Sequence, residues 1–178
     1  LNNESKVLEA RDWYLKAHSQ DHTLNEAAYG MGITYIQLPT KTRESTSLAK
    51  YWFALAAANN HTDAQFALGY LDEVAGDNKS AFNWYRISKE GGSFPAIFNL
   101  GRCYENGIGV AQSLEQARKH YRLAAMSGHP ESQYSLGLLI YNAANSELDL
   151  GEACMWWSLA RKNGVPEAIQ ALRKLEES

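Results

Sequence analysis

The sequence of 178 residues predicts an all-α protein, an α-solenoid of about five antiparallel helix-turn-helix repeats. Three observations predict this class. Paired ring residues return every 32 to 39 positions, small and aromatic side chains follow the period of a helix, and turn-forming residues return at the same spacing. The alternation with a period of two that would indicate strands is absent from the sequence.

Two signatures define the repeat. The first is a pair of ring residues with alanine three positions before it: Trp13-Tyr14, Trp52-Phe53, Trp84-Tyr85, His120-Tyr121 and Trp156-Trp157. The second is a glycine with a small residue five positions before it: Gly32, Gly69, Gly101 and Gly137, with Arg173 at this position in the last copy. Because independent positions share one period, the chain is an array of similar structural units.

Each unit is expected to be a helical hairpin. Ala81, Trp84, Tyr85 and Ser88 lie at i, i+3, i+4 and i+7, which places them on one side of a first helix. A turn-type residue suited to end that helix follows seven positions after the second ring residue: Asp21, Asn60, Gly92, Gly128 and Gly164.

The repeated glycine falls in the second helix, where glycine costs about 1 kcal/mol relative to alanine. A packing role would explain its return. We expect the ring of the first helix in each hairpin to fit against the glycine of the second, with Trp52, Trp84 and Trp156 as the wedges.

In chain order, the predicted repeats span residues 1–39, 40–76, 77–112, 113–148 and 149–178, within a single domain over 1–178. The first repeat is the least regular. A polar linker over 40–47 offers a Ser or Thr as the N-cap of the next helix. His61 and His129 are expected beside exposed backbone groups at the turns. The last helix becomes polar around Arg173, as a C-terminal capping helix requires.

Composition narrows the classes of partner. The net charge of −3 offers no general attraction for nucleic acid, and the 45% hydrophobic content permits a continuous core. No run of about 18 apolar residues predicts a membrane span. The two cysteines, Cys103 and Cys154, are not expected to pair. We expect a soluble monomer, and the compartment stays open.

The repeat resembles that of the Sel-like repeat (SLR) proteins, relatives of the tetratricopeptide repeats. The resemblance rests on Ala81-Phe82-Asn83-Trp84-Tyr85, on the Ala-Ala and Gly-His of residues 124–129, and on Leu100-Gly101 and Tyr104 before Gly107-Ile108-Gly109-Val110. It covers nearly the whole chain. It implies a right-handed superhelix of helix pairs that acts as an adaptor for other proteins, often in bacteria, where cytoplasm and periplasm are both compatible.

Three motifs suggest chemistry at first sight. The glycines of residues 107–110 resemble a phosphate loop, but they follow a helix and are expected to connect repeats. His18 and His22 have the spacing of metal ligands, but a turn is expected between them. Cys103 and His120 could pair as nucleophile and base, although Cys103 is expected to be a buried thiol. We therefore predict no catalytic residue, metal or cofactor.

The predicted partner-binding surface lies beside the ring pairs on the first helices. In helical-pair solenoids we expect these helices to line the concave side. The side chains assigned to this surface are Tyr51, Asn83, Arg86, Lys119 and Arg122. The three cations would form a basic strip suited to an acidic peptide, against the alternative of a solvated helix face.

The predicted function is that of a protein-interaction scaffold without enzyme activity, which holds a peptide or partner protein in its concave groove. Two alternatives stay open. One is a hydrolase-type enzyme on a solenoid scaffold, which requires a deep pocket that brings Cys103, a histidine and a carboxylate together. The other is a structural or oligomerisation segment of a longer protein. The sequence does not identify the partner.

Overall fold

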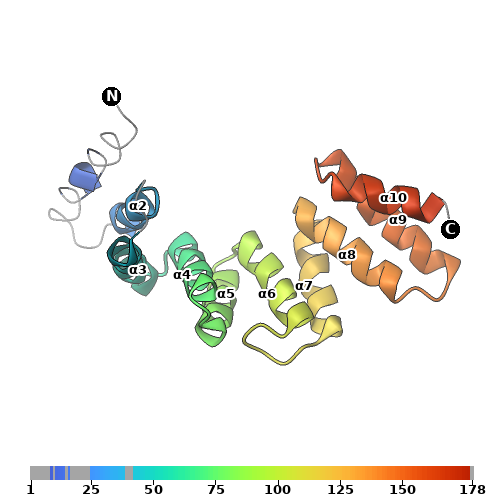
Figure 1. Cartoon of the computed structure of the whole chain (residues 1–178), viewed down its shortest axis with the longest axis horizontal. Coiled ribbons are helices and arrows are strands. Elements are labelled where there is room, and N and C mark those ends of the chain that lie inside the picture. Colours follow the sequence, from blue (N-terminus) through green and yellow to red (C-terminus); the bar gives the residue numbers. More distant parts are fainter. Residues whose placement is uncertain (1–8, 10, 15, 17–24, 39–41, 177–178) are drawn as a thin grey trace. The chain divides into compact units, whose positions relative to one another are not determined.

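The structure, a computed structural model, describes residues 9, 11–14, 16, 25–38 and 42–176. Within these residues every regular element is a helix, so the all-α prediction is confirmed (Figure 1). The helices are α2 (Asn25–Ile36), α3 (Arg43–Ala58), α4 (Thr62–Val74), α5 (Asn78–Glu90), α6 (Phe94–Asn106), α7 (Leu114–Met126), α8 (Pro130–Asn142), α9 (Glu147–Lys162) and α10 (Glu167–Glu176). None of the described helices is long and apolar enough to span a membrane.

The chain divides into two compact units. Unit 1 covers residues 1–93 and contains α2–α5, and unit 2 covers residues 94–178 and contains α6–α10. In unit 1 the closest packing joins α2 to α3 and α4 to α5, and in unit 2 it joins α6 to α7 and α8 to α9. A glycine-bearing helix therefore packs most closely on the aromatic helix that follows it in the chain. The single domain over 1–178 stays a prediction.

The predicted helix ends are confirmed at four turns. Asn60, Gly92, Gly128 and Gly164 all adopt the left-handed conformation, with φ between 63° and 93°. These residues lie in the short connections that follow the aromatic helices α3, α5, α7 and α9.

The helix starts use side-chain caps. Thr42 caps α3 in a capping box with Ser45, which confirms the N-cap expected in the 40–47 linker. His61 and His129 cap α4 and α8, where their Nδ1 atoms accept hydrogen bonds from the backbone N–H groups of Ala64 at 3.3 Å and Ser132 at 3.2 Å. Both histidines meet exposed backbone groups, as predicted.

The repeated glycines receive aromatic rings, but the expected pairing was wrong in two respects. An added Cβ at Gly69 would lie 2.7 Å from Cδ1 of Tyr85, and one at Gly137 would lie 2.6 Å from Nε1 of Trp157. The ring comes from the aromatic helix after the glycine, not from the one before it. It is also the second member of each pair that enters. The full set is Gly32 with Phe53, Gly69 with Tyr85, Gly101 with Tyr121, and Gly137 with Trp157.

The two tyrosines of this set each have a dedicated acceptor. The hydroxyl of Tyr85 donates to Glu73 at 2.7 Å, and that of Tyr121 donates to Glu105 at 2.6 Å. Each glutamate lies four residues after the glycine, one helical turn along the same helix. The Phe53 and Trp157 copies have Ile36 and Tyr141 at that position. The glutamate thus occurs where the ring has a hydroxyl to satisfy.

The first members of the pairs are less deeply placed than predicted. Trp52 and Trp84 are half-buried beside the core of unit 1, and Trp156 is buried with its Nε1 donating to Glu152 at 3.2 Å. Trp13, the first member of the first pair, is 64% exposed and therefore not part of a core.

Helix α10 is the last helix that the structure describes. Its inner face places Ala168 and Leu172 in one apolar cluster with Trp157, while Arg173 and Lys174 are exposed. Arg173 stands where the other repeats have glycine, and it is exposed. In the described part of the chain no aromatic helix follows α10 to cover this position.

Candidate functional site

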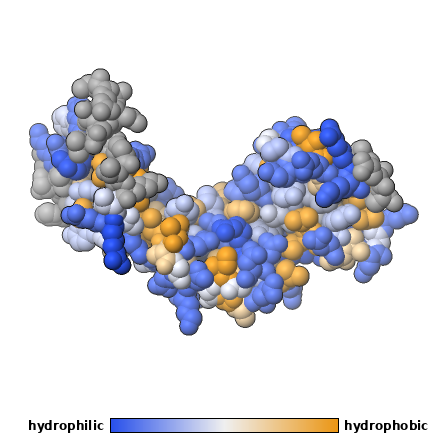
Figure 2. Space-filling model, viewed as in Figure 1, coloured by the Kyte–Doolittle hydropathy of each residue, from blue (hydrophilic) through white to orange (hydrophobic). Residues whose placement is uncertain are grey.

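In unit 1 a groove runs between the two glycine-bearing helices α2 and α4, over α3. It consists of two adjoining cavities, of about 210 Å³ and about 310 Å³, which share Ile36, Tyr70 and Leu71. The smaller cavity is lined by Tyr29, Ile33, Ile36, Phe53, Asp63, Phe66, Ala67, Tyr70 and Leu71, and the larger adds Tyr35, Ser45, Thr46, Val74 and Ala75. We call this the unit 1 groove. Figure 2 shows hydrophobic surface over this stretch of α4.

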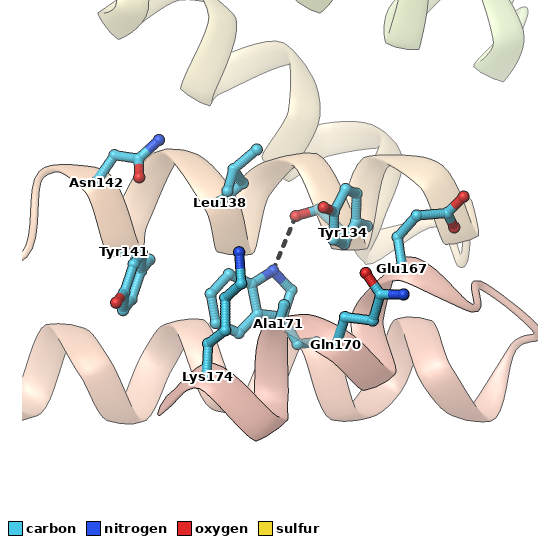
Figure 3. A pocket seen from close by; sticks show the side chains of 9 residues that line it. Tyr134, Leu138, Tyr141, Asn142, Glu167, Gln170, Ala171 and Lys174 are labelled. Carbon is cyan, nitrogen blue, oxygen red and sulfur yellow. Dashed lines mark hydrogen bonds between the residues drawn. The ribbon is translucent and has the colours of Figure 1, made fainter. Parts of the chain in front are cut away.

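Unit 2 contains a groove of about 260 Å³ between the glycine-bearing helix α8 and the capping helix α10. Figure 3 shows the lining side chains, with Tyr134, Leu138 and Tyr141 on α8 and Gln170 and Lys174 on α10. The full lining is Tyr134, Leu138, Tyr141, Asn142, Trp157, Glu167, Gln170, Ala171 and Lys174. We call this the unit 2 groove.

The two grooves occupy the same place in the repeat. Each has as its floor the ring that enters the glycine site, Phe53 in unit 1 and Trp157 in unit 2. The walls are equivalent too. Positions are counted from the repeat glycine, or from Arg173 in α10. Positions −3, +1 and +4 of α2 and α8 line the two grooves, as do positions −6, −3, −2 and +1 of α4 and α10. The repeat therefore builds a groove as a regular product of its packing.

The chemistry of the two grooves differs. The unit 1 groove is lined mainly by aromatic and aliphatic side chains, with one carboxylate at Asp63. Burial raises the pKa of the Tyr29 phenol, and the charges of Asp63 and Glu26 raise it further, so this end of the groove has a negative field. The unit 2 groove brings Glu167, Gln170 and Lys174 opposite its tyrosines.

The five side chains predicted to bind a partner lie on the aromatic helices. Tyr51, Asn83 and Arg86 are exposed on α3 and α5 of unit 1, and Lys119 and Arg122 lie on α7 of unit 2. None of the five lines either groove described above.

Two of the predicted cations already have partners. Lys119 pairs with Glu115 at 2.7 Å, and Arg122 pairs with Glu152 of α9 at 2.6 Å. The assignment of these five residues as a binding surface stays a prediction.

The motifs with possible chemistry have structural roles where the structure describes them. Residues 107–110 connect α6 to α7 and are held by Ile108 N–H donating to the Cys103 carbonyl at 2.9 Å. The loop joins two helices, as predicted, but these helices form one closely packed pair, so its assignment as a connector between repeats was wrong. Cys103 is buried, also as predicted, and both cysteines are free thiols. His120 contacts the Gln116 carbonyl at 2.9 Å. His18 and His22 lie outside the described residues.

The groove residues were missed at the sequence level, although a signal for them exists. An aromatic residue stands three positions before each of the four repeat glycines: Tyr29, Phe66, Phe98 and Tyr134. Tyr29, Phe66 and Phe98 each lie against the ring that enters the neighbouring glycine site, with ring centroids 5.7 Å apart. Each ring of this set nevertheless stays partly exposed. It is therefore available to form a surface.

Comparison with known proteins gives the family. The chain matches the Sel1 repeat over residues 5–22, 25–61, 62–93, 95–129 and 130–165. In unit 1 and unit 2 these matches join each glycine-bearing helix to the aromatic helix after it, in agreement with the packing. The repeats predicted above, such as 77–112, begin one helix later.

Two curated relatives are similar over part of their length. DAP3-binding cell death enhancer 1 of Rattus norvegicus is 34% identical over 100 residues, which cover 54% of this chain and 20% of the relative. Chitin synthase regulatory factor 4 of Schizosaccharomyces pombe is 28% identical over 152 residues, which cover 82% of this chain and 23% of the relative. The chain thus spans about a fifth of the length of these relatives.

Two solved structures share the fold. A Sel1 repeat protein from Oxalobacter formigenes superposes with a TM-score of 0.77 at 29% identity, over 91% of this chain and 65% of the other. A protective antigen of uropathogenic Escherichia coli strains with an SLR fold gives a TM-score of 0.83 at 26% identity, over 96% of this chain and 37% of the other. The chain belongs to the Sel1 repeat family.

Proposed function

We propose that this chain is a protein-interaction scaffold that binds an extended segment of a partner protein in the unit 1 groove and the unit 2 groove. The observation that carries the proposal is the recurrence of one groove at equivalent positions in both units, each with aromatic side chains on its walls. Concave sites of this kind, mostly apolar with a few polar groups, are typical of binding surfaces. The rigid helices supply the walls without a change of fold on binding.

The names of the relatives support a role through other proteins. One relative is described as binding DAP3 and the other as a regulator of chitin synthase. For this chain we propose the same class of action without catalysis. The Cys103 thiol is buried in α6 and lies outside the walls of both grooves, so the grooves offer a surface and not a nucleophile.

The exposed faces of α3, α5 and α7 are a second proposed surface, with Tyr51, Asn83, Arg86, Lys119 and Arg122 as its contacts. This second surface is supported by the exposure of its side chains and by the positive charge of Arg86. The groove has in addition a shaped cavity and apolar area to bury, which contribute most to association.

Affinity capture from the native cell with two matched double variants tests both surfaces. Tyr70→Ala/Leu138→Ser removes one wall of each groove, and Arg86→Glu/Arg122→Glu reverses charge on the aromatic helices. We expect a partner bound by the wild type to be lost with the first variant and kept with the second. The reverse result would assign the partner to the aromatic-helix face, and a partner kept by both would exclude both surfaces. Thermal unfolding by circular dichroism checks that each variant folds.

A further inference from the structure

We infer that the unit 1 groove selects a short, extended partner segment that carries a basic side chain at one end and apolar side chains at the other. This inference rests on the proposed function and specifies the ligand of one of its two grooves. It follows from the shape of the groove, from the distribution of apolar side chains along it, and from the sign of the charge at one end.

The dimensions of the groove limit the segment. Along α4 the lining extends from Asp63 to Val74. At 1.5 Å per helical residue this stretch measures roughly 16 Å, which an extended chain crosses with about five residues. A groove of this length accommodates two or three side chains directed into it, since successive side chains of an extended segment point to opposite sides.

The apolar end of the groove lies at the C-terminal ends of α2 and α4. Tyr35, Ile36, Tyr70 and Val74 line it, and Tyr70 and Val74 remain 55% and 69% exposed. Large apolar side chains with this exposure gain by being covered, and an aromatic ring beside a cavity is a common anchor in protein interfaces. This end therefore fits leucine, isoleucine or aromatic side chains of a partner.

The charged end lies at the N-terminal ends of the same helices. Asp63 is exposed and lines the cavity beside Tyr29, and Glu26 is one of the two carboxylates whose field reaches the Tyr29 phenol. His61 stacks on Tyr29 with ring centroids 4.6 Å apart, and its Nε2 lies 3.4 Å from Glu26 Oε1. The cation of α3 that reaches α4, Lys50, is paired with Asp72. The field at this end favours Lys or Arg on the partner.

The unit 2 groove supplies an internal contrast. At the equivalent wall it has Lys174 where the unit 1 groove has Tyr70, and Gln170 in place of Phe66. Its far wall is therefore more polar and carries a cation, Lys174, in addition to the carboxylate of Glu167 at the position of Asp63. The two grooves differ in ligand preference although the same repeat geometry builds them.

Selection from a phage-displayed library of random heptapeptides on the intact chain tests the inference. We expect the enriched peptides to carry Lys or Arg three or four positions from a Leu, Ile or aromatic residue. Synthetic copies of these peptides, labelled with fluorescein, are then titrated by fluorescence anisotropy. We expect Glu26→Gln/Asp63→Asn to weaken binding about tenfold and to reduce its salt dependence. Tyr70→Ala should also weaken it about tenfold.

The matched control is Glu131→Gln/Glu167→Gln, which makes the same change of charge at the equivalent positions of unit 2 and should leave the affinity unchanged. Enrichment of acidic peptides, or of apolar peptides without a basic residue, would overturn the inference. So would basic peptides whose affinity does not respond to Glu26→Gln/Asp63→Asn and Tyr70→Ala. If such peptides respond instead to Leu138→Ser, the proposed function stands and only the assignment to unit 1 fails. If no peptide binds the intact chain, both fail.

Discussion

At the scale of single residues, the structure depends on the four repeat glycines, where a helix lacks a side chain so that a ring can take its space. At Gly101 the ring is that of Tyr121, which is buried and donates its hydroxyl to Glu105 at 2.6 Å. The Tyr121 ring is closely packed and its hydroxyl group is hydrogen-bonded. A change at Gly101 or at Tyr121 therefore affects both the packing and the hydrogen bond.

Replacement of this glycine should destabilise the protein although alanine favours the helix. The Cβ of Gly101→Ala would lie 2.5 Å from the Tyr121 ring, and overpacking of this kind costs about 1–3 kcal/mol against a propensity gain of about 1 kcal/mol. We expect a net loss of up to about 2 kcal/mol in the free energy of unfolding, measured in urea. Gly151→Ala in α9 is the control, because no side chain lies within 4 Å of its position. It should gain up to about 1 kcal/mol, and a gain in both variants would refute the packing role.

At the scale of helices, local features of the sequence predicted the ends correctly but not the pairing. Asn60 and Gly128 end helices because a left-handed conformation is a property of those residues themselves. Which neighbouring helix a helix packs on is not set by such local residues. A stripe such as Ala81, Trp84, Tyr85 and Ser88 shows which face is buried, but helices lie both before and after it in the chain, and periodicity does not distinguish them.

The grooves escaped prediction for the same reason. Tyr29 and Phe66 lie on separate helices, and only the packing of α2 and α4 over α3 brings them to one cavity. Their return three positions before each glycine was visible in the sequence, but its meaning depended on knowing which side of the helix the glycine faces.

The start of α8 gives this helix a sensitivity to acid. His129 Nδ1 accepts a hydrogen bond from the Ser132 N–H at 3.2 Å, which requires an unprotonated nitrogen. Burial lowers the pKa of His129 below 6.5, and the nearby Glu131 opposes this only partly. Because the folded state binds the proton less well than the unfolded state, the stability from this cap is complete above pH 6.5 and is lost as the pH falls below it.

Comparison of the wild type with His129→Asn isolates this effect, since asparagine caps a helix without titrating in this range. The free energy of unfolding of the wild type should fall more steeply between pH 7.5 and pH 5 than that of the variant. The slope is the readout, because loss of the ring contact between His129 and Phe98 shifts the variant at every pH. Equal slopes would show that the cap does not depend on protonation.

At the scale of the whole molecule, each unit contains complete glycine-ring pairs of its own. Unit 2 holds two of them, at Gly101 with Tyr121 and at Gly137 with Trp157, and α10 adds Ala168 and Leu172 to the apolar cluster around Trp157. A unit with its own core has what independent folding requires.

Residues 94–178 should therefore fold when expressed alone, with helical circular dichroism and a cooperative transition in urea. The matched control is residues 113–178, which begin at a repeat boundary predicted from the sequence and lack α6. Without Gly101 the Tyr121 ring loses its site, and burial of such a ring is worth about 1.5–3 kcal/mol. The shorter fragment should be less stable by at least that amount, and equal stability would contradict the pairing of α6 with α7.

The order of glycine and ring along the chain also bears on how such a gene lengthens. A duplicated stretch contains both the glycine and the ring that packs on it only if the stretch begins before a glycine-bearing helix. The turns near Gly92 and Gly128 are such positions. A break in the 107–113 connection would instead separate Gly101 from Tyr121. Each of the two residues would then have to pack on a residue from another copy of the repeat. We therefore expect the insertion of a further repeat to be tolerated at the turns that precede a glycine-bearing helix, and not in the connection that follows one.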